Sequence, residues 1–264
     1  MRPPSLAARR AIALGLIHGP AELLPVSSSG HTTLIPWLRG WDQDSLDPAA
    51  RKRFEVALHA GTVLGLLVLM RGELALARLG TRRIAMLLAA TAPAAIAGLA
   101  LERPIERRLG RPLSVAAGLL GGSLAMAAAE RFGSSGRRGA EATATDGLAL
   151  GAAQALALIP GVSRSGVVRA AARLRGFDRA GAEALSLEIG LPVTIGALAL
   201  KARELSGAEP AEWLALSAGA AASFASTLAS GSLLRRAGSL VPYAAYRTAL
   251  AGVVLRRLRQ NAAR

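Results

Sequence analysis

The chain contains no cysteine, and only 3% of its 264 residues are aromatic. The lack of cysteine excludes a disulfide scaffold, thiol catalysis and metal sites built from thiolates. The scarcity of aromatic rings leaves few platforms on which nucleic-acid bases could stack, although the formal net charge is +15. We therefore expect no nucleic-acid partner, and we look for another reason for the basic charge.

Charged residues are absent from two long apolar runs, at residues 84–101 and 213–234. Apolar runs of about 18 or more uncharged residues are long enough to span a bilayer. Arginine pairs such as Arg82-Arg83 and Arg256-Arg257 flank apolar segments, as basic residues do at the ends of membrane helices. The N-terminal Arg9-Arg10 resembles the start of a signal peptide, but the charged and proline residues that follow indicate part of the mature protein.

The apolar segments are separated by short linkers, none of which is large enough for a soluble domain. They lie at about 11–38, 56–70, 84–101, 113–129, 147–162, 184–200, 213–234 and 239–255. Alanine and glycine dominate them, and small residues allow helices to approach closely within lipid. We therefore expect a single integral membrane domain over residues 1–264, folded as an all-α, polytopic helical bundle.

An internal repeat relates two halves of the chain, at about residues 11–130 and 147–258. With an offset of 136 residues, Leu14-Gly15 falls on Leu150-Gly151, and VSSSG at 26–30 falls on VSRSG at 162–166. Both copies interrupt an apolar segment with proline, glycine and serine. Broken segments at matching positions of two repeats predict a substrate site where the repeats meet.

The two interrupted segments carry residues that suit phosphate chemistry. A turn rich in serine and glycine that opens a helix exposes backbone N–H groups, and the helix dipole favours anions there. Arg164 adds a guanidinium suited to bidentate phosphate contact, and His31 can exchange a proton near neutral pH. His18 and Glu22 lie four residues apart, so on a helix they share a face and could hold a divalent cation.

Each of these residues also has a structural explanation. Ser27, Ser28 and Ser29 are typical helix-capping residues. His59 is typical of a hydrogen-bonded interior histidine, and Arg164 could pair with Glu22 or Glu188. A solvated or headgroup-facing stripe is expected for four further arginines: Arg169, Arg173, Arg175 and Arg179. The functional interpretation depends on the occurrence of all the candidate residues within two repeat-related loops.

Three stretches resemble signatures of the undecaprenyl-diphosphatase family, the bacterial bacitracin-resistance membrane phosphatases. They are GPAELLPVSSSGH at 19–31, FEVALHAGT at 54–62 and PGVSRSG at 160–166. The resemblance implies inverted-topology repeats with two re-entrant helical hairpins that meet within the membrane. It also implies hydrolysis of undecaprenyl diphosphate, the C55 lipid carrier, to undecaprenyl phosphate and phosphate, which recycles the carrier for peptidoglycan synthesis with the help of a divalent cation.

The resemblance implies roles for individual residues as well. The catalytic residues would be His31, Ser28, Glu22 and Arg164. The phosphate-binding residues would be Ser27, Ser28, Ser163, Arg164 and Ser165. The metal ligands would be Glu22, which matches the second Glu of the family's E-x-x-x-E motif, together with His18 and Glu55. Two mechanisms stay open: Ser28 as nucleophile with His31 as base, or a metal-activated water. We favour His31 as the acid/base or nucleophilic group, with Ser28 as a phosphate ligand.

This chain departs from the family's pattern at three positions. His18 stands where the family has the first Glu of E-x-x-x-E, Val168 where many members carry Thr, and Glu188 where members usually have an apolar residue. Imidazole is a softer ligand than carboxylate, so we expect the family's Mg²⁺ or Ca²⁺ to give way partly to Mn²⁺. Glu188 would restore a carboxylate only if its half of the bundle faces His18.

Two other classes of protein share features with this sequence. A non-catalytic or divergent polyprenyl-phosphate binder or transporter fits the repeat architecture and the missing Glu. Acid-phosphatase-type lipid phosphatases also carry PSGH and SR motifs, but they use a second histidine after the SR, and no histidine follows His59. Phosphate release by the purified protein separates the hydrolase from the transporter.

The resemblance implies a multi-pass protein of the bacterial plasma membrane, surrounded by membrane lipids, with its site open to the outer face. The distribution of basic residues between the linkers is too even to fix the orientation. The sequence leaves the oligomeric state open, a homodimer being one option.

Overall fold

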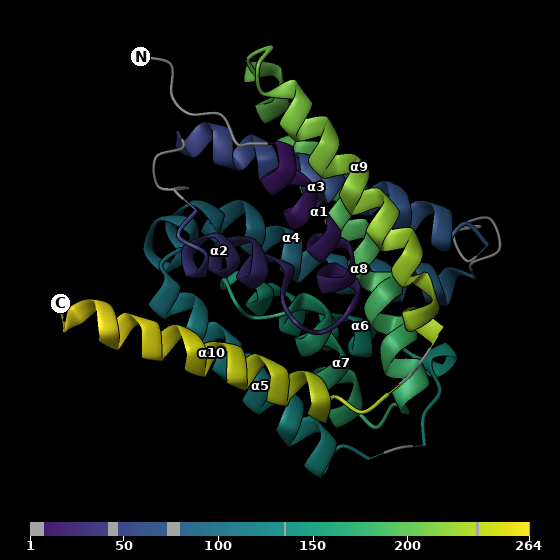
Figure 1. The fold of residues 1–264 in the computed structure, drawn as a ribbon. Helices are drawn as coiled ribbons and strands as arrows, with labels where there is room; N and C mark the ends of the chain where they lie inside the picture. Colours follow the sequence, from purple (N-terminus) through teal and green to yellow (C-terminus); the bar gives the residue numbers. More distant parts are fainter. Residues whose placement is uncertain (1–7, 42–46, 73–79, 135, 236–237, 264) are drawn as a thin grey trace.

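A computed structural model of the chain describes residues 8–41, 47–72, 80–134, 136–235 and 238–263. These residues form ten α-helices joined by loops and 3-10 turns, and a lone β-bridge between Arg137 and Phe177 is their only extended pairing (Figure 1). The helices are α1 (Ala8–Leu23), α2 (Ser28–Leu38), α3 (Pro48–Leu69), α4 (Thr81–Leu109), α5 (Pro112–Phe132), α6 (Ala144–Ala155), α7 (Arg164–Leu174), α8 (Arg179–Lys201), α9 (Trp213–Ala229) and α10 (Val241–Ala262). The prediction of an all-α protein is confirmed.

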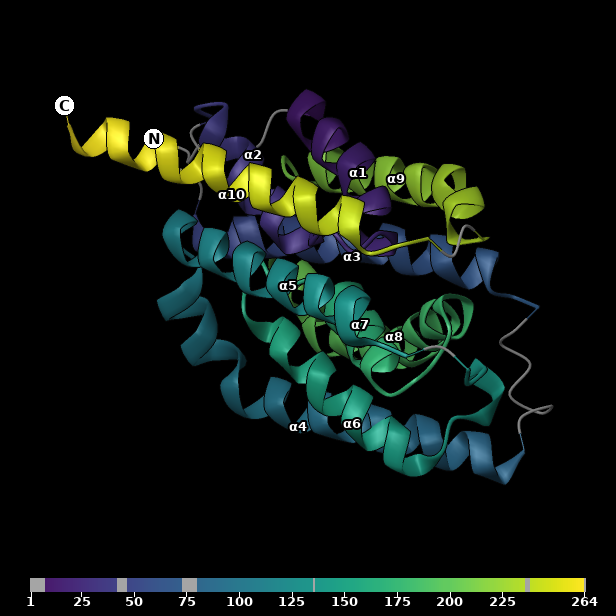
Figure 2. The same ribbon diagram turned by 90° about the horizontal axis from the view of Figure 1, so that it is seen from below.

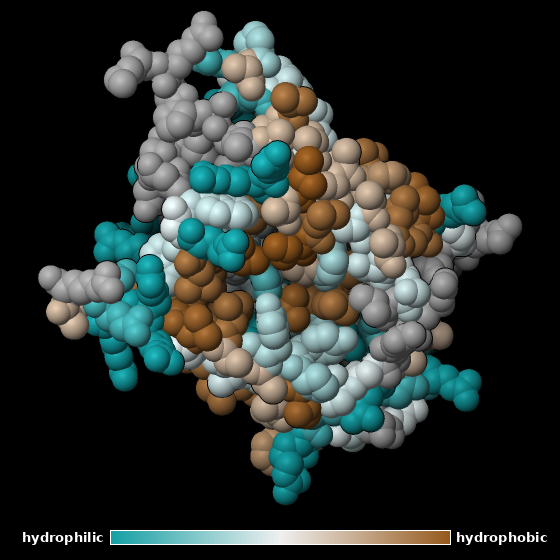
Figure 3. Space-filling view, viewed as in Figure 1, coloured by the Kyte–Doolittle hydropathy of each residue, from teal (hydrophilic) through white to brown (hydrophobic). Residues whose placement is uncertain are grey.

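Four helical segments in the described residues are long and apolar enough to cross a membrane. They are Thr81–Leu101, Pro112–Phe132, Arg179–Gly207 and Trp213–Ser232. Large apolar side chains on α4 point outward, with Leu88, Ile96 and Leu99 each about two-thirds to three-quarters exposed. Figure 3 shows hydrophobic residues over much of the centre of one face, with hydrophilic residues mostly toward its margins. An apolar outer surface of this extent suits contact with lipid, and the protein is a membrane protein.

The predicted apolar segments at 11–38 and 147–162 are each broken by a loop. The first break separates α1 from α2, and the second follows α6 and a 3-10 turn at Leu156–Leu158. Each following helix begins at a serine cap. The Ser27 hydroxyl accepts a hydrogen bond from the Gly30 amide at 3.2 Å, and the Ser163 hydroxyl accepts one from the Gly166 amide at 3.2 Å. Residues related by the 136-residue offset therefore share the same capping hydrogen bond, although the backbone differs, with φ +78° at Ser27 and −73° at Ser163.

The two halves pack by exchanging helices. Helix α1 of the first half lies along α9 of the second, and α6 of the second half lies along α4 of the first. These two pairs lie on opposite sides of the molecule in Figure 2, with α5 and α7 between them. Glycines permit the close approach, because a Cβ at Gly15 would lie 2.4 Å from the Gly219 carbonyl, and one at Gly151 would lie 2.4 Å from the Ala90 carbonyl.

The prediction of a solvated or headgroup-facing arginine stripe is wrong for two of the four arginines. Arg169 and Arg173 are buried, with 4% and 6% of their surface exposed. Arg169 pairs with Glu183 at 3.6 Å, and Arg173 donates to the Phe177 carbonyl at 2.7 Å. Sequence spacing alone predicts a basic face, but the acidic and carbonyl partners on α8 and the preceding turn draw these two side chains inward.

Candidate active site

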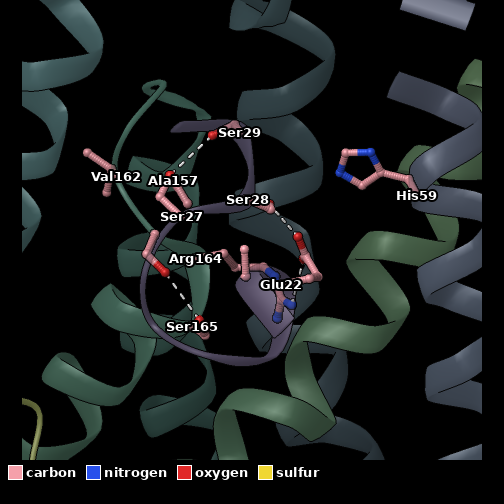
Figure 4. A pocket seen from close by; sticks show the side chains of 11 residues that line it. Glu22, Ser27, Ser28, Ser29, His59, Ala157, Val162, Arg164 and Ser165 are labelled. Atoms are coloured by element: carbon pink, nitrogen blue, oxygen red, sulfur yellow. Dashed lines mark hydrogen bonds and ion pairs between the residues drawn. The ribbon is translucent and has the colours of Figure 1, made fainter. Parts of the chain in front are cut away.

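The two interrupted loops meet at a cavity of about 160 Å³ between α1, α2, α3 and α7 (Figure 4). At roughly 30 Å³ per water, this volume equals that of about five water molecules, which leaves room for a phosphate group. The walls are largely polar. They are formed by Ala21, Glu22, Ser27, Ser28, Ser29, His59, Ala157, Val162, Ser163, Arg164 and Ser165. All five predicted phosphate-binding residues line this one cavity.

The first loop has a strained backbone at Ser27. Its φ is +78°, a left-handed conformation that a non-glycine residue rarely adopts. The surroundings hold it there, since the Ser27 carbonyl accepts hydrogen bonds from the backbone and from the side chain of His31. Strain of this kind is often found where a site must be preorganised. Ser28 and Ser29, the first residues of α2, consequently face the cavity.

The second loop is pressed against α5. Gly161 has a φ of +92°, and a Cβ there would lie 2.2 Å from the Val115 carbonyl. Gly118 on α5 gives similar room, because a Cβ there would lie 2.2 Å from the Pro160 carbonyl. Only glycine fits both positions, so the sequence allows the loop to turn sharply and to open α7 at the cavity.

Glu22 connects the two loops. Ser28 Oγ donates a hydrogen bond to Glu22 Oε2 at 2.5 Å, and Arg164 Nη2 donates to Glu22 Oε1 at 3.1 Å (Figure 4). Arg164 Nη1 also donates to the Ser186 carbonyl on α8 at 3.3 Å. The carboxylate is therefore the acceptor for a hydroxyl from the first loop and for a guanidinium from the second, and Arg164 pairs with Glu22.

Three side chains beside the cavity form a group that could hold a metal ion. One ligand atom each from His18, Glu22 and His59 lies within 4.8 Å of the others. The two imidazole rings meet edge to face, with centroids 4.6 Å apart. Two imidazoles and one carboxylate form a donor set that suits divalent cations. Glu55, the third predicted ligand, is not among these three side chains, and its backbone carbonyl accepts a hydrogen bond from His59 Nδ1 at 2.8 Å.

A chain of hydrogen bonds surrounds His18 Nδ1. Thr62 Oγ1 lies 2.8 Å and Ser223 Oγ 3.3 Å from Nδ1, the two hydroxyls lie 2.7 Å apart, and Ser223 Oγ lies 2.9 Å from the Leu58 carbonyl. All these contacts are satisfied when Nδ1 donates to Thr62, Thr62 donates to Ser223 and Ser223 donates to Leu58. In that tautomer the buried Nε2, which has no hydrogen-bond partner, carries the lone pair. An unprotonated, unpaired Nε2 is what a metal ligand requires.

His31 faces away from the cavity and is not among the residues that line it. Its Nδ1 donates to the Ser27 carbonyl at 2.7 Å, because a carbonyl can only accept. Its Nε2 then accepts from the Tyr246 hydroxyl on α10 at 2.7 Å. Both ring nitrogens are thus engaged in holding α2. The predicted role of His31 as acid, base or nucleophile would require it to leave these partners.

Glu188 does not restore the missing carboxylate. It forms an ion pair with Arg83 on α4, with Arg83 Nε donating to Glu188 Oε1 at 2.7 Å. Val168 is fully buried in a core cluster with Phe177 and Leu185, so it packs rather than binding phosphate.

Several contacts around the cavity were not predicted from the sequence. His59 is hydrogen-bonded, as expected, but it also joins the group with His18 and Glu22. The position of all three histidines within residues 18–59 is the sequence signal for that group. Gly190 on α8 leaves space for the Arg164 side chain, since a Cβ at position 190 would lie 1.5 Å from Arg164 Nη1. Tyr246 and Arg247 on α10 carried no recognisable sequence signal.

Known proteins resemble this chain over nearly its full length. The chain matches the family described as bacitracin resistance protein BacA over residues 11–253. It is 39% identical to an undecaprenyl-diphosphatase of Geobacter sulfurreducens, with 93% of this chain and 96% of the relative covered. It is 36% identical to an undecaprenyl-diphosphatase of Pelobacter propionicus, with 93% and 95% covered. The match spans both loops and nearly all the helices, and the chain belongs to the bacitracin resistance protein BacA family.

Proposed function

We propose that this protein hydrolyses undecaprenyl diphosphate to undecaprenyl phosphate and phosphate. The relatives that cover almost its full length carry the name of this activity. The observation that carries the proposal is the convergence of two serine loops, Glu22 and Arg164 on one polar cavity. Recycling of the lipid carrier for peptidoglycan synthesis, and with it bacitracin resistance, follows from that reaction.

The cavity suits a diphosphate because two helices begin at it. Helices α2 and α7 each have 11 residues, and their first residues, Ser28 and Arg164, line the wall. Helix N-termini attract anions through free N–H groups and the helix dipole. Serine hydroxyls and the Arg164 guanidinium add donors for the phosphate oxygens.

The charge of the site favours a divalent cation. Among the lining residues, Arg164 is the one permanent cation and Glu22 the one carboxylate, so their charges cancel. A diphosphate brings two to three negative charges that need compensation. His18, Glu22 and His59 fit a divalent cation, given the buried unpaired Nε2 of His18. When bound, such an ion would supply Lewis-acid stabilisation of phosphate charge, and two imidazoles favour Mn²⁺ over Mg²⁺ or Ca²⁺.

The geometry supports Glu22 as the group that accepts a proton from Ser28. Ser28 Oγ would form a bond to the terminal phosphorus while its proton passes to Glu22 Oε2, 2.5 Å away. The bond from that phosphorus to the bridging oxygen breaks, and the lipid monophosphate leaves with the electron pair. Water then attacks the phosphorus of the phosphoserine, and the bond from that phosphorus to Ser28 Oγ breaks. Ser28 regains its proton from Glu22, and phosphate leaves with the oxygen and both hydrogens of the water. His31, held by Ser27 and Tyr246, orients α2 in this scheme.

Phosphate release by the purified protein from undecaprenyl or farnesyl diphosphate, with Mg²⁺, Ca²⁺ or Mn²⁺, tests the activity. Hydrolysis by the wild type and its loss in Glu22→Gln are expected. Binding of the lipid without release with any of the three metals would favour the transporter alternative. Rapid quench into neutral denaturant with labelled diphosphate tests the nucleophile, because phosphohistidine, unlike phosphoserine, does not survive acid. Label on Ser28 supports the scheme, and label on His31 or on neither residue contradicts it.

Arg164→Ala should remove most of the activity, by on the order of a hundredfold or more, since a charge-assisted contact in the transition state is lost. Arg164→Lys should recover little of it, because an ammonium lacks the planar fork that also reaches Ser186. Steady-state kinetics of both variants measure this, and an Arg164→Ala enzyme within threefold of wild type would contradict the site.

We also propose that the two halves are inverted-topology repeats, and that α1–α2 and α6–α7 are re-entrant hairpins. The equivalent serine caps and the reciprocal packing of α1 on α9 and α6 on α4 support this. The site would open to the outer face of the plasma membrane. Because the chain has no cysteine, Ser29→Cys gives a unique label site, and its modification in intact cells by an impermeant reagent tests the orientation. Chemical cross-linking of the same cells tests a homodimer.

A further inference from the structure

Helix α10 carries an arginine that is fully buried and lies outside the catalytic cavity. Arg247 has no exposed surface, and no carboxylate among the described residues pairs with it. Its guanidinium is surrounded by backbone carbonyls. Nη1 donates to Pro25 at 3.3 Å, and Nη2 donates to Gly161 at 2.9 Å, Leu119 at 3.1 Å and Gly118 at 3.4 Å.

The carbonyls come from both catalytic loops and from the helix behind them. Pro25 lies two residues before Ser27, and Gly161 lies two residues before Ser163. With the 136-residue offset, Pro25 and Gly161 are equivalent positions of the repeat. A single guanidinium therefore binds the same point of each loop, and it ties both to α5 through Gly118 and Leu119.

The chain makes space for this side chain. A Cβ at Gly122 on α5 would lie 2.2 Å from Arg247 Nη2. The positive φ of Gly161 turns its carbonyl toward the guanidinium. The fold thus positions one residue from the last helix so that it reaches backbone atoms about 90, 130 and 220 positions earlier in the chain.

The neighbouring residue reaches the first loop as well. Tyr246 donates its hydroxyl proton to His31 Nε2 at 2.7 Å, and the two rings stack with centroids 5.7 Å apart. His31 in turn donates to the Ser27 carbonyl. Two adjacent residues of α10 therefore hold the loop that presents Ser28, and one of them also holds the loop that presents Arg164.

A buried cation without a carboxylate partner is costly, and Arg247 Nε has no hydrogen-bond partner either. Burial of an apolar side chain would serve packing alone at less cost. The N–H donors of the guanidinium lie in one rigid plane, so they fix the distance between the Pro25 carbonyl of the first loop and the Gly161 carbonyl of the second. Catalytic groups that have shifted by about 1 Å can lose on the order of a hundredfold in rate.

We infer that Arg247 is a positioning residue, which sets Arg164 of the second loop against Glu22 and Ser28 of the first. The inference rests on the proposed function for its kinetic consequence, although the loop geometry can be measured independently. Arg247 does not touch the cavity, so its effect should appear in kcat more than in KM.

The kinetic test compares Arg247→Met and Arg247→Lys with Arg257→Met, a matched control that removes an exposed arginine from the same helix. Arg247→Met should lower kcat on the order of a hundredfold with KM within about threefold. Arg247→Lys should recover part of this, because an ammonium can reach one loop but not span both. A wild-type kcat in Arg247→Met overturns the inference. Full recovery of kcat in Arg247→Lys also overturns it, because a positive charge alone would then be sufficient.

A spectroscopic test measures the loops without substrate. The chain has no native cysteine, so Thr33→Cys on α2 and Leu174→Cys on α7 give a unique pair of spin-label sites. Arg247→Met should broaden or shift the distance distribution, and Arg257→Met should leave it unchanged. An unchanged distribution in Arg247→Met overturns the inference. If the wild type releases no phosphate, the proposed function fails, while this measurement still decides whether Arg247 sets the loop geometry.

Gly122→Ala provides a variant that keeps the charge if Arg247→Met does not fold. The added methyl would displace the guanidinium from Gly161 and Leu119. We expect a lowered kcat and a broadened spin-label distance in Gly122→Ala, whereas Gly121→Ala, next to it but facing open space, should match the wild type in both. Equal behaviour of the two alanine variants contradicts the inference.

Discussion

Glu22 contacts several different groups at this site. The Glu22 carboxylate accepts from Ser28 and from Arg164, and it also belongs to the group with His18 and His59. Substitution of Glu22 therefore removes several functions together and cannot separate them. Substitutions that affect only Arg164 or only the two histidines separate these functions better.

Gly190→Ala should reduce activity although it removes no catalytic atom. An added Cβ would lie 1.5 Å from Arg164 Nη1, so the guanidinium must move away from Glu22. We expect a loss of about ten- to a hundredfold in kcat, smaller than that of Arg164→Ala, since the charge stays nearby. Gly196→Ala on the same helix faces open space and is the control. Equal kinetics of the two variants would show that Arg164 does not need this position.

His18→Glu should shift the metal preference of the site. A second carboxylate adds negative charge and a hard oxygen ligand, so Mg²⁺ should support hydrolysis better than in the wild type. Titration of Mn²⁺ by electron paramagnetic resonance measures binding apart from activity, and affinity should fall in His59→Gln, which removes one imidazole from the group. An unchanged metal profile and Mn²⁺ affinity in both variants would mean that the histidines only pack beside the cavity.

At the scale of elements, the start of α6 is fixed by one carboxylate. Asp146 accepts from the Thr143 backbone amide, and it pairs with Arg137 and Arg175 at 2.6 Å each. Arg137 precedes α6 and Arg175 ends α7, so Asp146 joins the two ends of the helix pair that carries the second loop. The Arg137 guanidinium holds the pKa of this carboxyl well below its usual value.

Asp146→Asn should destabilise the protein by about 2 to 3 kcal/mol at pH 7. The expected loss lies at or below the loss of stability on breaking a fully buried ion pair. The reason is that Arg137 and Arg175 are about a third exposed. A carboxyl whose folded pKa is depressed stabilises the fold fully above its unfolded pKa of about 4 and loses that contribution as the pH falls further. Thermal unfolding in detergent should therefore separate variant and wild type at pH 7, and the difference should shrink below pH 4. A constant difference over this range would contradict the linkage.

At the scale of the whole molecule, the halves are held together by exchanged helices with small residues at the contacts. Gly147 and Gly151 on α6 approach the Met86 and Ala90 carbonyls of α4, and Gly15 on α1 approaches α9. Helices within lipid associate through close packing of this kind, because burial of apolar surface gives little advantage there. The loops lie at the ends of α1 and α6, so these contacts also determine how the loops face each other.

Gly151→Leu should destabilise the bundle by about 1 to 3 kcal/mol or more, since the side chain has no space against Ala90. Gly98→Leu on α4 adds the same volume where nothing lies within 4 Å and should be neutral. Unfolding in detergent compares the two. Similar stability of both variants would show that the α4–α6 contact tolerates expansion.

The helical membrane fold, the two matching loops and most of the cavity wall can be predicted from the sequence alone. These features are local: apolar length, the capping serines Ser27 and Ser163, and the 136-residue offset can be recognised without knowing which segments touch. The serines predicted to bind phosphate and Arg164 are recognised in this way, and they line one cavity.

Which distant side chains meet becomes visible in the folded protein. His59 joins His18 and Glu22 because α3 packs beside α1, Glu188 turns to Arg83, and Arg169 and Arg173 are buried by partners. Tyr246 and Arg247 reach the first loop from more than 200 positions away, and Arg247 reaches the second loop from 86 positions away. Residue type and spacing suggest partners, as Glu22 for Arg164, but they do not choose among them, because the choice depends on how whole helices pack between the halves.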